Sequence, residues 1–194
     1  MTDDIKKKID VVFIAGGKFH DIDFARLEIL KLLAEDDRMK VRVFEDYSNL
    51  HAIEKADFLI TYTCDVRPTL EQQRVLKNYV SSGNRWLALH GTNSILQFMS
   101  DGKVDSPRIA PVMMETLGSQ FIAHPPIEPY NVKVSQPDHP LVKGVEEFET
   151  TDELYLMELH GDLDVLLEAD YDGKAEGFVE EDWPQETWPV FYSK

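Results

Sequence analysis

The chain has 194 residues, of which 43% are hydrophobic, enough for one packed core and too many for a disordered chain. Its formal net charge of −16 argues against nucleic acid or an anionic membrane as the main partner. The single cysteine excludes an internal disulfide and a multi-cysteine metal site, and it fits a reducing compartment.

The first half of the chain alternates strand-like and helix-like patterns. Short β-branched apolar runs predict strands, and apolar positions that recur every three to four residues predict helices. Strands are expected at Ile9–Ala15, Lys40–Glu45, Ala56–Thr63 and Arg85–His90, with helices from Ile22 to about Asp36 and from Pro68 to the Gly83 cap. Asp21 and Thr69 are suited to cap the two helices. This alternation indicates a parallel sheet that helices cover on both faces.

The second half predicts shorter and more polar elements. A short apolar helix is expected after Gly91–Ser94, then a helix over Ile109–Leu117 and a fifth strand at Ser119–Ala123. Polar-interrupted strands follow, and their turn sequences favour antiparallel pairing. They are expected at Tyr130–Ser135, Thr151–Leu159, Val165–Ala169 and Gly177–Val179, with turns at Pro137–Asp138, Gly161–Asp162 and Asp172–Gly173. No linker divides the chain, so we expect one domain over residues 1–194.

The start of the chain shows no targeting pattern. The apolar run Ile9–Ala15 contains Asp10 and ends at Gly16–Gly17. It is therefore too short for a signal peptide or a membrane span. We expect a cytoplasmic protein that does not contact membranes.

Ligands of doubly wound sheets bind beyond the carboxyl ends of the strands, near the point where strand order reverses. This rule selects the loops after the first, third, fourth and fifth strands, and three of the six histidines fall there. His20 follows the double glycine and is either a ligand or general base, or a solvated residue at a helix start. His90 ends a buried strand at a sharp turn, where it is either reactive or bonded to a neighbouring carbonyl.

Other groups near these loops carry weaker signals. Thr92 and Ser94 become nucleophiles only beside a base, and the alternative for Thr92 is a helix cap. Cys64 lies near Arg67, which would stabilise a thiolate, although a small buried side chain is its commoner role. A divalent metal such as zinc is a further alternative, with His20, His90 and His124 as its ligands. No close-spaced ligand pair supports that metal, and no other cofactor is indicated.

Acidic residues are concentrated in the second half of the chain. Residues 1–97 hold 14 basic and 15 acidic side chains, whereas residues 98–194 hold 6 and 21. The run Glu146–Glu186 contains 16 acids and one lysine, for which a solvated acidic face is the plainest interpretation. Within it, Asp152–Tyr155 is either an edge strand or a segment that aims Glu153 at the site as an acid or base.

Together these motifs resemble the ThuA-like (trehalose-utilisation) family. Five segments carry the resemblance, in order over nearly the whole chain: the first strand with Gly16, Gly17 and His20; Thr69–Gly83 with Leu87–His90; Gly118–Phe121 with His124–Pro125; Asp138–Pro140 with Gly144; and Asp152–Tyr155. The resemblance implies a flavodoxin-like, class I glutamine amidotransferase-like three-layer α/β sandwich. Its parallel sheet would carry antiparallel additions in the second half.

The resemblance also implies a function in carbohydrate metabolism, on trehalose-type disaccharides or keto-sugars. It makes His20, His90 and Glu153 the catalytic candidates, and Gly16, Gly17, Thr92, Asn93, His124 and Tyr155 the substrate-binding ones. His139 would be structural or at the rim. The elbow after Leu89 carries no cysteine, so glutamine hydrolysis is not expected. A non-catalytic sugar-binding or regulatory module and a metal-dependent hydrolase remain open alternatives.

The expected partner is a small uncharged carbohydrate, because no phosphate-binding loop pattern surrounds Lys18. A homo-oligomer is compatible with the sequence. Family members usually continue beyond the equivalent of Lys194 with a glycine turn, a strand and a Gly-His segment. The resemblance therefore implies that these elements are missing from this sequence.

Overall fold

The computed structural model describes residues 7–194, and these residues form two compact units. The first unit holds the residues up to Ile95 together with Ile109–Thr116, and the second holds Leu96–Arg108 with Leu117–Lys194. The expectation of a single domain over the whole chain stays a prediction.

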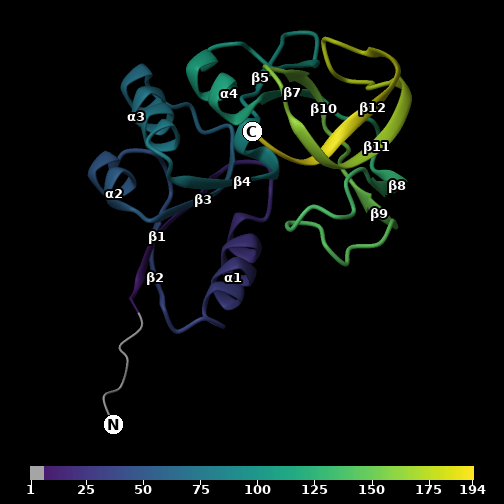
Figure 1. Ribbon diagram of the computed structural model, residues 1–194. Helices are drawn as coiled ribbons and strands as arrows, with labels where there is room; N and C mark the ends of the chain where they lie inside the picture. The colour runs from purple at the N-terminus through teal and green to yellow at the C-terminus, as the bar shows by residue number, and fades with distance from the viewer. Residues whose placement is uncertain (1–6) are drawn as a thin grey trace. The chain divides into compact units, whose positions relative to one another are not determined.

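A parallel four-stranded sheet forms the centre of the first unit. In chain order its elements are β1 (Ile9–Gly17), α1 (Ile22–Leu33), β2 (Met39–Phe44), α2 (Leu50–Lys55), β3 (Phe58–Cys64), α3 (Leu70–Ser81), β4 (Arg85–Leu89), a 3-10 turn (His90–Asn93) and α4 (Pro111–Leu117). The strand order is β2-β1-β3-β4, and every pairing is parallel. Helix α1 covers one face of the sheet and helices α2 and α3 the other (Figure 1). This arrangement confirms the predicted flavodoxin-like, three-layer α/β fold.

Burial on both faces of β1 explains why its sequence is apolar without alternation. Val11, Phe13 and Ala15 pack with Ile60 in one cluster, against which residues of α1 are placed. The residues between them in the strand are equally buried. Successive side chains of a strand point to opposite faces, so both faces of the sheet are covered.

The capping signals confirm the two predicted helices. The Asp21 side chain accepts a hydrogen bond from the backbone N of Phe24 at 2.9 Å, at the start of α1. Thr69 and Gln72 form a reciprocal capping box at the start of α3. Gly83 follows α3 with φ +88°, a backbone conformation that favours glycine.

Two segments of the first half differ from the predictions. Helix α2 was not predicted, although the Asn49 side chain caps it by accepting from the backbone N of Ala52. The apolar helix expected after Ser94 does not form. Its residues are too few for a stable helix, and Gln97–Phe98 pairs as a strand with Val104–Asp105 instead.

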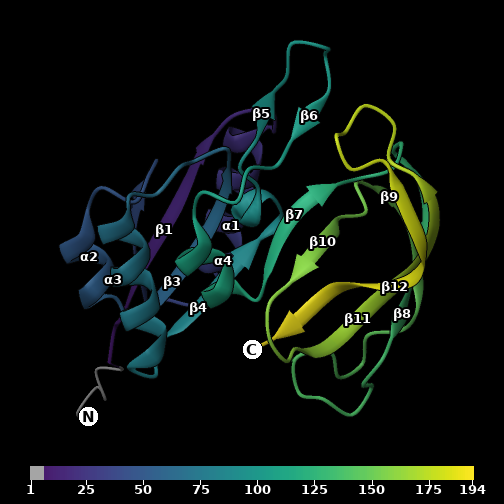
Figure 2. The same cartoon turned by 90° about the horizontal axis from the view of Figure 1, so that it is seen from above.

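The second unit is built from antiparallel strands. They are β5 (Gln97–Phe98), β6 (Val104–Asp105), β7 (Ser119–Ala123), β8 (Glu128–Val134), β9 (Phe148–Asp152), β10 (Leu156–Leu159), β11 (Asp164–Lys174) and β12 (Asp182–Ser193). The sheets are β5-β6, β10-β7 and β12-β11-β8-β9. Figure 2 shows the four-stranded sheet curving opposite β7 and β10. A core that includes Phe121, Leu156, Ala169 and Trp188 joins these two sheets.

Several strand predictions in this unit need correction. The predicted fifth strand forms as β7, with the expected bounds, but it pairs antiparallel with β10. The strand predicted over Thr151–Leu159 is two strands, because pairing with β8 stops at Asp152 and pairing with β7 begins at Leu156. A turn was expected at Asp172–Gly173, but strand β11 continues through these residues. Its pairing with β12 shifts register there instead.

The longest strand of the unit was missed. Strand β12 contains Pro184 and Pro189, and proline argues against a strand unless the strand lies at a sheet edge. In the described part of the chain it does lie at an edge, next to β11. Gly177–Val179 belongs to the loop before β12, where Phe178 makes only an isolated bridge to Val104.

No helix within residues 7–194 combines the length and the apolar character that a bilayer crossing requires. 

The buried Gln73 side chain joins α3 to the start of α4. Its Nε2 donates to Pro68 O at 3.1 Å, and its Oε1 accepts from the backbone N of Val112 at 3.2 Å. Gln73→Leu would leave these backbone groups unpaired, so we expect the free energy of unfolding to fall by about 1–3 kcal/mol. Urea denaturation measures this, with the exposed Lys77→Leu on the same helix as control. Equal stability of the two variants would contradict the linking role.

Alkaline pH is expected to destabilise the protein through buried tyrosines. Burial raises the pKa of Tyr79 to about 12, and Asp57 adds to the shift. An unfolded tyrosine ionises near pH 10, so between about pH 10 and 12 only the unfolded state loses this proton. The stabilisation is therefore complete below pH 10 and is lost as pH rises through that window. Tyr79→Phe should flatten this fall in denaturation free energy, and an unchanged slope would contradict the assignment.

Candidate functional site

Three loops of the first unit meet at the carboxyl edge of its parallel sheet. They follow β1, β3 and β4, and the strand order reverses between β1 and β3. Such a switch point is where ligands of open α/β sheets bind. The backbone N of Lys18 donates to Cys64 O at 3.0 Å, and the backbone N of Asp65 donates to Ser94 O at 3.0 Å. The loops are therefore joined directly to one another.

Two histidines lie together at this edge. The ring centroids of His20 and His90 are 4.6 Å apart, and both side chains are half-buried. The Tyr62 ring, from β3, lies 6.1 Å from the His90 ring and nearly parallel to it. Within the first unit, the structure thus brings together His20 and His90, both of them predicted catalytic residues. Sequence analysis missed Tyr62, whose only signal was an aromatic hydroxyl near the carboxyl end of a central strand.

The backbone at this edge is strained. Among residues 7–194, the non-glycine residues with positive φ are Phe19 at 71°, Asp65 at 53° and His90 at 44°, one in each loop. Such conformations cost about 1–3 kcal/mol each and persist only where the surroundings enforce them. Strain of this kind is concentrated at functional sites, so its placement supports this edge as the candidate site.

Glycines allow the loops to pack this closely. A Cβ on Gly91 would lie 2.7 Å from Thr63 O and 3.3 Å from Cδ2 of His20. A Cβ on Gly16 would lie 2.0 Å from Glu45 O, and one on Gly17 would lie 1.9 Å from Cys64 O. The double glycine therefore makes room for the backbone just after β2 and at the end of β3. Substrate contact by Gly16 and Gly17 stays a prediction.

The turn after β4 is held by buried polar side chains. Thr92 Oγ1 donates to Leu89 O at 2.9 Å and lies 3.1 Å from Thr61 Oγ1. Asn93, Ser94 and Cys64 are also buried. These contacts give Thr92 a role in shaping the His90 turn. Substrate binding by Thr92 and Asn93 stays a prediction, as does reactivity of Cys64.

One nearly buried carboxylate forms ion pairs that connect the loop after β1 to the loop after β3. The Asp65 side chain is 5% exposed, with Lys18 Nζ 3.1 Å from Oδ2 and Arg67 Nε 3.1 Å from Oδ1. Lys18 and Arg67 are thus partly neutralised by the same carboxylate. Neither is placed as a dedicated anion ligand.

A depression of about 340 Å³ lies beside His20. Its lining includes Gly17, Asp21, Asp23, Arg26 and Glu45. Arg26 is fixed there, because Nη2 donates to Ala15 O at 2.8 Å and Nη1 donates to Asp23 at 2.7 Å. The volume is at the lower end of the roughly 300–1,000 Å³ usual for small-molecule sites.

A larger depression, of about 400 Å³, lies at the opposite edge of the sheet. Its lining includes Ile9, Asp57, Phe58 and Asn84, at the amino ends of the strands or next to them. Ligands of open α/β sheets bind at the carboxyl edge, so we assign the site to the smaller depression.

The other site candidates lie in the second unit. His124 Nδ1 is 2.7 Å from Pro125 O, and its Nε2 is 3.8 Å from Oε1 of Glu153. Tyr155 packs on Phe121 with 4.5 Å between ring centroids. This unit therefore brings His124 and Glu153 together, and their predicted roles at the site stay predictions. His139 lies in a turn, where its Nδ1 accepts from the backbone N of Leu141.

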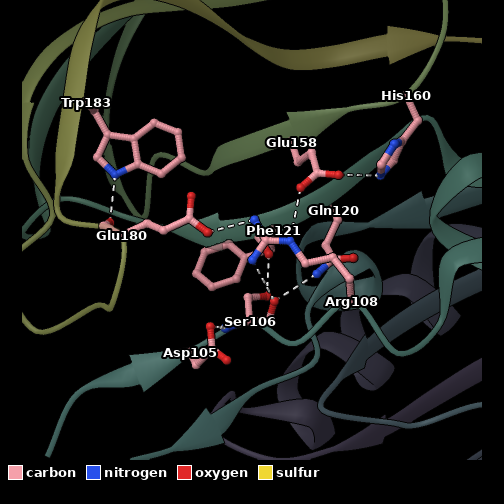
Figure 3. A network of polar contacts seen from close by, with 9 residues as sticks. All are labelled: Asp105, Ser106, Arg108, Gln120, Phe121, Glu158, His160, Glu180 and Trp183. Atoms are coloured by element: carbon pink, nitrogen blue, oxygen red, sulfur yellow. Dashed lines mark hydrogen bonds and ion pairs between the residues drawn. The ribbon is translucent and has the colours of Figure 1, made fainter.

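The second unit also contains a polar network that the sequence did not indicate. Arg108 Nε donates to Glu158 at 3.0 Å, and its Nη2 donates to Glu180 at 2.7 Å (Figure 3). Glu158 also lies 3.8 Å from Nε2 of His160. Nearby, Gln120 Nε2 donates to Ser106 O at 3.0 Å. The network holds the segment before α4 to β10 and to the loop before β12.

Two of the candidate residues are of the type that holds zinc. Catalytic zinc takes three protein ligands, of which His20 and His90 could supply two. A divalent metal bound by His20, His90 and His124 therefore stays a prediction.

Comparisons with known proteins agree with this fold. The chain is 17% identical to a ThuA-like protein from Bacteroides uniformis, with a TM-score of 0.74 over 97% of this chain and 78% of that one. It is 18% identical to a ThuA-like protein from Parabacteroides merdae, with a TM-score of 0.57 over 92% and 74%. Identities this low show the fold alone. No curated protein sequence matches the chain significantly.

The sequence profile of one protein family matches nearly the entire chain. The family is ThuA, described as trehalose utilisation, and the match covers residues 10–193. It includes all the segments on which the resemblance depended, from the strand before His20 to Asp152–Tyr155. The chain therefore belongs to the ThuA family.

Proposed function

We propose that this protein acts in carbohydrate metabolism on a neutral trehalose-type disaccharide or its keto form. The observation that carries the proposal is the pair His20 and His90, 4.6 Å apart at the switch point of the sheet. Membership of the trehalose-utilisation family supports the class of substrate. The catalytic site would be the carboxyl edge formed by the loops after β1, β3 and β4.

The two imidazoles are suited to proton transfer. Histidine is the side chain that most readily gains and loses a proton near neutral pH. At this separation, one imidazole can accept a proton from the substrate while the other donates a proton to an oxygen of the same substrate. Tyr62, which stacks on His90, would fix the orientation of that ring.

The charges beside His20 favour an uncharged substrate. Asp21, Asp23 and Glu45 line the depression together with Arg26, so carboxylates outnumber the cation. Carboxylates accept hydrogen bonds from sugar hydroxyls and repel phosphate groups. Glu153 as an assisting acid or base, with His124 and Tyr155 as substrate contacts, remains part of the proposal.

Calorimetric binding and product analysis with trehalose and 3-ketotrehalose test the proposal. We expect one of the two sugars to bind and to be converted. Binding without product would instead favour a sugar-binding or regulatory module. If neither sugar binds and neither is converted, the proposed substrate class is overturned.

A further inference from the structure

Two phenylalanine rings of the second unit pack against the imidazole of His124. The ring centroids of Phe178 and His124 are 4.9 Å apart, and the ring planes cross at 71°. Phe121 lies 6.1 Å from the same imidazole and 5.8 Å from the Phe178 ring. Phe178 is only 8% exposed, so close packing fixes its place. The imidazole therefore has an ordered aromatic wall on one side.

The loop that carries Phe178 is fastened on both sides of this residue. The backbone N of Val104, in β6, donates to Gly177 O at 2.8 Å, and the backbone N of Val179 donates to Val104 O at 2.9 Å. Two ion pairs, each 2.7 Å long, hold the next part of the loop: Arg108–Glu180, drawn in Figure 3, and Lys103–Glu181. The loop thus holds the Phe178 ring in one position against His124.

The contacts of His124 also determine which of its ring nitrogens is open. Nδ1 lies 2.7 Å from Pro125 O, and a carbonyl oxygen only accepts hydrogen bonds. Nδ1 therefore carries the hydrogen of the neutral ring, and Nε2 is an acceptor. Nε2 lies 3.8 Å from Oε1 of Glu153, and both side chains are partly exposed. Two acceptors side by side suit two neighbouring hydroxyl groups of a sugar, each of which donates to one of them.

From these contacts we propose that Phe178 is the positioning residue of His124 and keeps Nε2 turned toward the sugar. Without the aromatic wall, the imidazole would be free to rotate and to lose its bond to Pro125 O. Phe178 acts only through the imidazole and does not touch the substrate. The proposal deepens the proposed function and rests on its assignment of His124 as a substrate contact.

NMR of the histidine ring nitrogens tests the positioning directly and needs no substrate. Phe178→Leu keeps an apolar side chain in the core, so we expect it to fold, but it removes the flat ring. At about pH 9, above the usual range of imidazole ionisation, ¹⁵N shifts distinguish the two tautomers. We expect the hydrogen of His124 on Nδ1 in wild type and on both nitrogens in Phe178→Leu. His124→Ala assigns the signals.

Phe148→Leu is the matched control for this comparison. Phe148 lies on β9 of the same unit and is 43% exposed, so its replacement should leave the His124 signals unchanged. If Phe178→Leu retains the wild-type tautomer, the positioning role is overturned.

A double-mutant cycle on sugar affinity tests the link to the substrate. With the sugar that wild type binds, Phe178→Leu and His124→Ala should each weaken calorimetric affinity about three- to tenfold, the value of one hydrogen bond. The double variant should bind no more weakly than His124→Ala, because Phe178 acts through that ring. Additive losses, or affinity of Phe178→Leu within twofold of wild type, would overturn the proposal. If wild type binds neither sugar, the proposed function fails, and the NMR comparison still decides whether Phe178 orients His124.

Discussion

Replacing Gly17 by alanine is expected to lower the free energy of unfolding by about 2–6 kcal/mol. The new Cβ would lie 1.9 Å from Cys64 O, and the backbone φ of 109° is one that alanine rarely adopts. Overpacking and backbone strain each cost about 1–3 kcal/mol. Because a domain of this kind is stable by about 5–15 kcal/mol, the variant would lose a large share of its stability. Urea denaturation followed by circular dichroism measures the loss.

Gly83→Ala provides a control, because Gly83 also has a positive φ but lacks the close contact. Gly83 has φ +88°, and nothing lies within 4 Å of the position of its Cβ. We expect this variant to lose only about 1 kcal/mol. The difference between the two variants thus isolates the packing of the end of β1 against the end of β3. Equal losses would show that Gly17 serves backbone conformation alone.

Loss of either histidine should almost abolish turnover of the sugar substrate. A positioned acid or base contributes about 10²- to 10⁴-fold to a rate, so His20→Ala and His90→Ala should each lower kcat by that factor. Residues that act as one unit are strongly non-additive, so the double variant should lose little more than either single one. His90→Asn preserves folding at φ 44°, because asparagine tolerates the left-handed region.

His51→Ala is the matched control for these kinetic experiments. His51 is exposed on α2, which lies on the other face of the sheet from α1. Its removal should leave kcat unchanged. Fully additive losses in the His20–His90 double variant would mean that the two imidazoles act independently, against the proposed pair.

Local signals in the first half of the sequence predicted its structure well. The cap at Asp21 and the capping box at Thr69 act through neighbouring residues, and the apolar strands have the length and composition of a buried parallel sheet. In the second half, local and tertiary preferences disagree. The prolines of β12 argue against a strand, yet an edge position accommodates them. Gly173 indicated a turn but lies at a register shift within β11.

The candidate site was predictable only where it follows from topology. Parallel strands end at one edge, so His20 and His90 could be placed together from their positions after β1 and β4. Tyr62 could not be singled out, because its relation to His90 depends on ring orientation. The strained φ of Phe19 was likewise invisible, since no sequence pattern records a non-glycine residue in the left-handed region.

The most direct test of the account is a crystal structure of the protein soaked with trehalose and, separately, with 3-ketotrehalose. The account predicts sugar density at the carboxyl edge of the parallel sheet, within hydrogen-bond distance of His20 or His90 and beside Arg26 and Glu45. Density confined to the larger depression at the opposite edge, against Phe58 and Asn84, would contradict it.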